Sequence, residues 1–317
     1  MYREPIFFEP VFQERIWGGT ALRDIFNFEI PNDSTGEAWV ISAHKNGPSI
    51  VKNGVLKGKN LWELWNYYPH LFSGKTATEE FPLLIKILDA NDDLSVQVHP
   101  DDIYARRHEG EQYGKTECWY ILDCADDAEI IFGHFADSEE EFRRKVEEGK
   151  WNELLKRVKV KKGDFVYVPS GTIHAIGKGI VILETQQSSD ITYRVYDFDR
   201  IDNKGEKREL HIEQAIKVTS FPHNVEEQKR VEETVESLTT TQLIAEKYFT
   251  VYHWRLDGNV ITPLNKDYLL MSVIEGEGKI IIEGNEFKLK KGDNFIMPAT
   301  VFDYELCGTI EIIVSHT

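Results

Sequence analysis

Four side chains with nitrogen or oxygen donor atoms are spaced so that they could bind one metal ion. In the run Ser-Val-Gln-Val-His, Gln97 and His99 stand two residues apart, and residues two apart on a strand project from the same face. Glu117 begins another strand-like run, and His174 ends a turn with Pro and Gly. A lone buried histidine is more often a core residue, but strand ends that converge on one cavity favour ligands. This Gln/His/Glu/His set suits Zn, Mn or Fe and leaves a position for substrate or water.

The sequence contains an internal repeat at an offset of 129 residues. Residues 160–174 match residues 289–303, with Lys-Lys-Gly-Asp and a later Pro in register. This pattern predicts a turn, a short buried strand, and a second turn that directs the last residue into a barrel. That residue is His174 in the first copy and Asp303 in the second. The first copy, with spacing G-x5-P-x-G-x2-H, resembles the second motif of the cupin superfamily, and only this copy keeps the metal-competent histidine.

The elements that must position these residues are mostly strands. Short alternating or apolar runs, bounded by Gly, Asn, Asp or Pro, predict a mainly β protein of two cupin (jelly-roll type) β-barrels with short helical additions. Ser138 is an expected helix N-cap, with Glu141 three residues later. An acidic, polar segment at 224–241 predicts the joint between a metal-binding domain, 1–235, and a degenerate cupin domain, 236–317. The expected strands are 37–43, 81–88, 94–99, 117–122, 129–134, 165–169, 180–187 and 191–198, and the expected helices are 61–72, 138–158 and 211–218.

The composition excludes several classes of partner. The chain has 317 residues, of which 37 are Lys or Arg and 54 are Asp or Glu, a net charge of −17. Because this field repels phosphate backbones and anionic lipid, neither nucleic acid nor a membrane is an expected partner. A small anionic substrate requires cations gathered in a pocket. Three cysteines and an N-terminus unlike a signal peptide predict a cytoplasmic protein, which we expect to be a monomer or weak homodimer.

Several longer motifs follow one another along the chain: Trp17-Gly-Gly, Glu37-Ala-Trp, Gln97-Val-His-Pro-Asp-Asp, Gly114-Lys-Thr-Glu, Pro169-Ser-Gly-Thr-Ile-His-Ala, and Glu184-Thr-Gln-Gln-Ser-Ser-Asp-Ile-Thr-Tyr-Arg-Val-Tyr-Asp. In this order they resemble the motifs of type I mannose-6-phosphate isomerases. The chain is shorter than the long members of that family and has only short helical patterns where they carry a larger helical insertion. The resemblance implies one zinc ion per chain, held by Gln97, His99, Glu117 and His174, and interconversion of mannose 6-phosphate with fructose 6-phosphate.

Aldose–ketose isomerisation moves a proton between C2 and C1 through an enediol, so it needs a base and a group that stabilises the developing oxyanion. Glu184 is the expected base and Arg194 the expected stabilising cation. If residues 188–190 form a tight hairpin loop, strand pairing places Glu184 opposite Arg194. A purely structural cross-strand ion pair is the alternative for these two residues.

Three further residues are candidates for contact with the substrate. Lys115 stands two residues before Glu117 on the same face and is a third catalytic candidate, or a solvated strand end. Lys86 interrupts an apolar run, so it either binds substrate or forms a buried ion pair. Trp17 is expected to line the substrate site. Other functions left open are another cupin sugar-phosphate isomerase or metalloenzyme, and a non-catalytic sugar-binding cupin.

Overall fold

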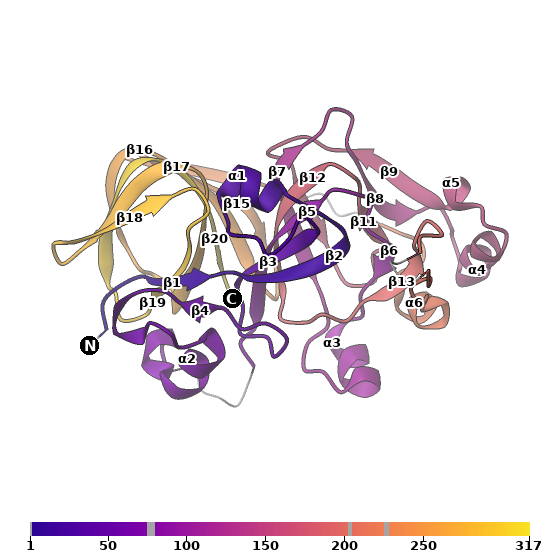
Figure 1. Cartoon of the computed structure of the whole chain (residues 1–317), viewed down its shortest axis with the longest axis horizontal. Coiled ribbons are helices and arrows are strands. Elements are labelled where there is room, and N and C mark those ends of the chain that lie inside the picture. The colour runs from indigo at the N-terminus through magenta and orange to yellow at the C-terminus, as the bar shows by residue number, and fades with distance from the viewer. Residues whose placement is uncertain (1, 75–79, 202–204, 225–227) are drawn as a thin grey trace.

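The computed structural model describes residues 2–74, 80–201, 205–224 and 228–317, which form three antiparallel β-sheets (Figure 1). In spatial order, the six-stranded sheet consists of β10 (Phe165–Val168), β7 (Glu117–Cys124), β12 (Ile180–Gln187), β5 (Leu83–Ala90), β3 (Thr35–Ile41) and β2 (Val11–Gly19). The five-stranded sheet consists of β13 (Tyr193–Tyr196), β6 (Val96–Val98), β11 (His174–Ile176), β8 (Glu129–His134) and β9 (Leu155–Lys159).

The nine-stranded sheet contains most of the C-terminal part of the chain. Its order is β14 (Val231–Val235), β15 (Leu238–Ala245), β16 (Thr250–Pro263), β20 (Asp303–His316), β17 (Tyr268–Ile282), β19 (Asn294–Pro298), β1 (Ile6–Glu9) and β4 (Ile50–Val51), and β18 (Asn285–Lys290) pairs with β17. The predicted mainly β class is confirmed. The strand pairing leaves all three sheets open and does not close two barrels.

The helices are short. No helix in the described part of the chain has the length and apolar character needed to cross a membrane. The Ser138 Oγ accepts a 3.2 Å hydrogen bond from the Glu141 backbone N–H, which confirms the predicted N-cap. The predicted helix 138–158 is too long, because residues 155–159 form β9 and take backbone partners from β8. The helical segments are α1 (Ala21–Phe26), η1 (Gly54–Leu56), α2 (Leu61–Tyr67), η2 (Pro69–Phe72), α3 (Asp102–Tyr104), η3 (Ala105–Glu109), α4 (Glu139–Glu147), α5 (Trp151–Leu154) and α6 (Ile212–Val218).

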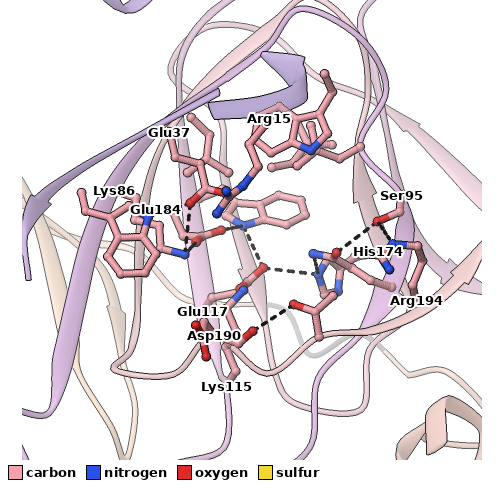
Figure 2. A pocket seen from close by; sticks show the side chains of 18 of the residues that line it. Arg15, Glu37, Lys86, Ser95, Lys115, Glu117, His174, Glu184, Asp190 and Arg194 are labelled. Atoms are coloured by element: carbon pink, nitrogen blue, oxygen red, sulfur yellow. Dashed lines mark hydrogen bonds and ion pairs between the residues drawn. The ribbon is translucent and has the colours of Figure 1, made fainter. Parts of the chain in front are cut away.

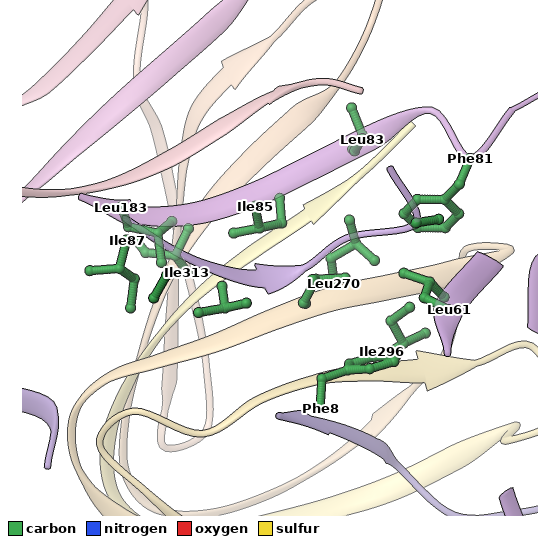
Figure 3. Packing of buried hydrophobic residues seen from close by; sticks show 14 of the residues in the cluster. Phe8, Leu61, Phe81, Leu83, Ile85, Ile87, Leu183, Leu270, Ile296 and Ile313 are labelled. Carbon is green, nitrogen blue, oxygen red and sulfur yellow. The ribbon is translucent and has the colours of Figure 1, made fainter. Parts of the chain in front are cut away.

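The largest apolar cluster joins the six-stranded sheet to the nine-stranded sheet (Figure 3). Leu183 of β12 and Ile85 of β5 belong to it together with Leu270 of β17, Ile296 of β19 and Ile313 of β20, and each of these side chains is at most 2% exposed. Burial of this apolar surface stabilises the contact between the sheets. Through this cluster, the nine-stranded sheet packs against the six-stranded sheet.

Strand pairing links the two predicted domains. The N-terminal strand β1 pairs with both β19 and β4, so residues near the start of the chain complete the C-terminal sheet. Part of the acidic segment forms the edge hairpin of β14 and β15, whereas its residues 225–227 lie outside the described residues. Division of the chain at residues 235 and 236 stays a prediction.

Candidate active site

A cavity of about 470 Å³ lies between the six-stranded and five-stranded sheets (Figure 2). Every predicted catalytic, substrate-binding or metal-ligating residue except His99 lines this cavity. The His99 imidazole packs beside the His174 imidazole, with the two ring centroids 4.8 Å apart. The sheets thus bring together residues that the sequence separates by more than 170 positions. The predicted residues in its walls are Trp17, Lys86, Gln97, Lys115, Glu117, His174, Glu184 and Arg194.

Three of the predicted metal ligands form one compact donor cluster. The ligand atoms of His99, Glu117 and His174 all lie within 4.8 Å of one another, and each residue is 1% exposed. Glu117 Oε2 lies 3.5 Å from His99 Nε2, and Glu117 Oε1 lies 3.4 Å from His174 Nε2. The Gln97 amide, opposite His174 in the β6–β11 register, approaches its Nε2 to 3.4 Å. Tetrahedral zinc with bonds of about 2.0–2.2 Å requires donors separated by roughly 3.3–3.6 Å, so the distances of 3.4 and 3.5 Å to the imidazole nitrogens fit a metal ion.

The backbone orients both imidazoles toward this centre. The Nδ1–H of His99 donates to the Ile191 carbonyl at 2.7 Å, and that of His174 donates to the Thr172 carbonyl at 2.9 Å. Each Nε2 therefore carries the free lone pair. Burial lowers the pKa of His174 to about 4, and burial together with Lys115 holds the pKa of His99 well below its usual range. Both rings are neutral at pH 7, as metal ligands must be.

A cation already contacts two of the donor atoms. The Lys115 ammonium lies 2.8 Å from Glu117 Oε2 and 3.1 Å from His99 Nε2. Burial alone would lower the pKa of Lys115, but the carboxylates of Glu117 and Glu184 outweigh it and raise that pKa. The buried, anionic and imidazole-rich set therefore fits a divalent metal ion such as zinc.

The predicted pairing of Glu184 with Arg194 is wrong. Both edges of β12 are occupied, by β5 and β7, so Glu184 lies opposite Lys86 and Trp119. The following segment crosses to the other sheet, where Arg194 of β13 lies opposite Gln97 of β6. Glu184 and Arg194 nevertheless line the same cavity, from opposite walls.

A buried charge network covers the wall formed by the six-stranded sheet. Lys86 Nζ lies 3.7 Å from both Glu37 Oε2 and Glu184 Oε1, and Arg15 Nε donates to Glu37 Oε1 at 2.8 Å. Lys86 thus forms the buried ion pair that was one of the two alternatives, and it also lines the cavity. Burial opposes ionisation of Glu37, but Lys86 and Arg15 hold its pKa at about 2. Burial and Glu117 raise the pKa of Glu184, which makes it the more basic carboxylate.

The sequence analysis missed several residues that line or shape the cavity. Arg194 donates from Nε to Ser95 Oγ at 3.3 Å and from its guanidinium to the Glu209 carbonyl at 2.8 Å, so neutral groups hold it. The Trp119 indole N–H lies 3.1 Å from both Glu117 Oε1 and Glu184 Oε2. A signal for Trp119 existed, because Glu117-Cys-Trp119 repeats the Glu-x-Trp spacing of residues 37–39. The missed residues are Arg15, Glu37, Ser95, Trp119, Asp190 and Arg208.

Comparison with known proteins gives matches at both ends of the chain. Residues 6–128 match the family model "Phosphomannose isomerase type I, catalytic domain", and residues 239–317 match "Mannose-6-phosphate isomerase, cupin domain". Mannose-6-phosphate isomerase ManA of Bacillus subtilis (strain 168) is 54% identical over 316 residues, which is 100% of each chain. Mannose-6-phosphate isomerase of Streptococcus mutans is 52% identical and covers 99% of this chain and 98% of its own.

A solved structure agrees with these matches. The crystal structure of mannose 6-phosphate isomerase from Bacillus subtilis has a TM-score of 0.97 and 49% identity, and the match covers 99% of this chain and 100% of that one. The fold and the site define a mainly β protein with a cupin domain and a candidate metal centre. The chain belongs to the type I mannose-6-phosphate isomerase family.

Proposed function

We propose that this chain is a zinc-dependent mannose-6-phosphate isomerase that interconverts mannose 6-phosphate and fructose 6-phosphate through an enediol. The observation that carries the proposal is that one cavity holds the buried cluster of His99, Glu117 and His174 together with Glu184 and Arg194. Relatives with this name at 52–54% identity over nearly the whole chain support it. We also propose that the chain consists of two cupin units, 1–235 and 236–317.

Gln97, His99, Glu117 and His174 would hold the zinc ion. Bound zinc would supply a Lewis acid that polarises a substrate oxygen or holds the sugar in place. The Gln97 side chain would contribute its carbonyl oxygen, which exchanges place with the amide nitrogen by rotation of the terminal amide group.

Glu184 is the base in this proposal, taking the proton from C2 of the aldose and returning it to C1, while a second proton passes from the C2 hydroxyl to the C1 oxygen. Its raised pKa makes its carboxylate a stronger acceptor at neutral pH. Lys86 and Trp119 contact one carboxylate oxygen each and thereby fix its orientation. Arg194, from the opposite wall, would stabilise negative charge on the enediolate or phosphate oxygens, and Lys115 adds positive charge beside Glu117.

The cavity also accounts for the binding of a sugar phosphate by an acidic chain. Five cations and four carboxylates line its walls, so the cavity has a small excess of positive charge although the net charge of the whole chain is −17. Such local clustering attracts an anionic substrate where the overall field does not. Trp17 supplies an apolar surface beside them and is 4% exposed. The cations in the walls are Arg15, Lys86, Lys115, Arg194 and Arg208.

A coupled assay that detects fructose 6-phosphate tests the proposal. We expect the purified protein to convert mannose 6-phosphate, to lose this activity on chelation, and to regain it when about one zinc ion per chain is restored. Full activity in metal-free protein would contradict the role of the metal. Turnover of glucose 6-phosphate instead would indicate a different isomerase, and binding without turnover would indicate a sugar-binding cupin.

A further inference from the structure

Two Glu-x-Trp sequences lie in the six-stranded sheet, one on β3 and one on β7, with β12 and β5 between them. In β3 the Trp39 indole N–H donates to Glu37 Oε2 at 2.6 Å, and in β7 the Trp119 N–H donates to Glu117 Oε1 at 3.1 Å. Residues two apart on a strand share a face, so the same spacing creates the same hydrogen bond. The second indole differs because a further carboxylate oxygen, Glu184 Oε2, also lies 3.1 Å from its nitrogen.

The strand register explains this double contact. Glu184 of β12 lies directly opposite Trp119 of β7, while Glu117 precedes Trp119 by two residues on the same strand. Trp119 is fully buried, and its ring meets the His174 imidazole edge-on with centroids 5.5 Å apart. The indole plane is therefore locked by packing, and its single N–H points between two buried carboxylates.

We propose that Trp119 is a positioning residue whose single N–H orients both the metal-ligating carboxylate of Glu117 and the proton-transferring carboxylate of Glu184. This inference rests on the proposed function. Hydrogen bonds from a neutral donor to a buried anion are among the stronger ones, and they fix the direction of the remaining lone pairs. On Glu117 the bond acts as an outer-shell contact to a metal ligand.

On Glu184 the same bond complements the Lys86 ion pair. Lys86 lies nearest to Oε1 and Trp119 to Oε2, so rotation of the carboxylate breaks one contact or the other. A base held in one orientation keeps its lone pair aligned with the C–H bond that it must break. Zinc affinity and proton transfer therefore depend on one hydrogen-bond donor.

Replacement of Trp119 by 3-benzothienylalanine tests this, because sulfur takes the place of the N–H while the shape is kept. We measure the zinc dissociation constant by chelator competition, and kcat and KM at saturating zinc. We expect zinc binding weakened about 10-fold and kcat lowered about 10- to 100-fold, with KM changed less than about twofold, since the bond touches no binding group of the sugar. Trp119→Phe removes the same N–H group with a natural residue.

Two control variants separate this role from packing. The same analogue at Trp39 removes a matched hydrogen bond to Glu37, which is outside the donor cluster, so zinc affinity stays as in the unaltered protein. Trp65→Phe alters a buried indole of the core between the sheets, away from the cavity, and leaves kcat and zinc affinity unchanged.

The outcomes distinguish the two proposals. If the analogue at position 119 shows unchanged zinc affinity or unchanged kcat, the inference is overturned, and this result does not require the Phe variant to fold. An unaltered protein that binds zinc but does not isomerise mannose 6-phosphate would overturn the proposed function instead.

Discussion

The two copies of the internal repeat have the same local structure but different surroundings. In the first, the Asp164 carboxylate accepts from the Lys161 N–H at 2.9 Å, and in the second Asp293 accepts from Lys290 at 2.9 Å. The second turns also match: the Thr172 N–H donates to the Pro169 carbonyl, and the Val301 N–H donates to the Pro298 carbonyl. Local sequence thus dictates the same two turns twice.

The copies differ in what lies beside their last residue. His174 enters the five-stranded sheet opposite Gln97 and meets Glu117 across the cavity. Asp303 is exposed at the start of β20, opposite Pro263. The space behind the second copy contains packed apolar side chains, including Met271, Ile280, Phe295, Met297, Leu306 and Val314. The turn alone therefore does not make a site; polar partners from other strands are required.

The comparison predicts the largest contrast when the last residue of each copy is removed. His174→Ala is expected to abolish both zinc binding and isomerase activity, because it removes one of the buried donors. Asp303→Ala is expected to change neither. Metal analysis and steady-state kinetics on the same preparations check this, and a fully active His174→Ala protein would break the comparison.

The apolar interior of the second copy predicts a large effect on stability alone. Phe295 is fully buried there, so Phe295→Ala is expected to lower the free energy of unfolding by about 3–5 kcal/mol. The folded fraction should keep normal zinc content and kcat. Urea unfolding and kinetics per folded molecule measure the two effects, and loss of zinc from the folded variant would show that the regions are coupled.

Glu184→Gln tests whether the cavity beside the first copy supplies the catalytic base. This change keeps the shape of the side chain and a hydrogen-bonding group while removing basicity, so kcat is expected to fall by roughly 100-fold or more with zinc retained. Glu311→Gln, which removes a carboxylate from the nine-stranded sheet, is the matched control and should leave kcat unaltered. Normal turnover by Glu184→Gln would move the role of base to Lys115 or to another group.

The smallest expected effect is a pH dependence of stability in the cavity wall. The pKa of Glu37 is about 2 in the folded chain, against an ordinary value of 4.5. A lowered pKa adds stability above pH 4.5 that is lost as the pH falls toward 2. Between pH 6 and pH 3 the metal-free protein should therefore lose roughly 2 kcal/mol that Glu37→Gln does not lose.

Urea unfolding of both proteins at several pH values in this range measures the difference. Asp303→Ala, which removes an exposed carboxylate of the second copy, serves as the control and should follow the unaltered protein. Parallel stability curves for Glu37→Gln and the unaltered protein would contradict the contribution assigned to the buried Glu37 ion pairs.

The sequence by itself determined the strand content, the helix cap at Ser138 and many of the residues that line the cavity. Period-two patterns and turn residues report local backbone structure, so the strands predicted from them are present with small shifts in their ends. The His99, Glu117 and His174 donors were identified because their residue types restrict the chemistry that they can perform. The sequence motifs also indicated the family of the chain, and the full-length relatives confirm it.

Only the tertiary structure decided which of these residues meet. The local pattern around residues 184–194 favoured a hairpin, but β5 and β7 occupy both edges of β12, so the chain crosses to the other sheet and Glu184 meets Lys86 and Trp119. Residues 155–159 become a strand for the same kind of reason, since the free edge of β8 supplies their hydrogen-bond partners. Strand pairing is a competition among distant segments for backbone donors and acceptors, and a local sequence pattern carries no record of which segment wins.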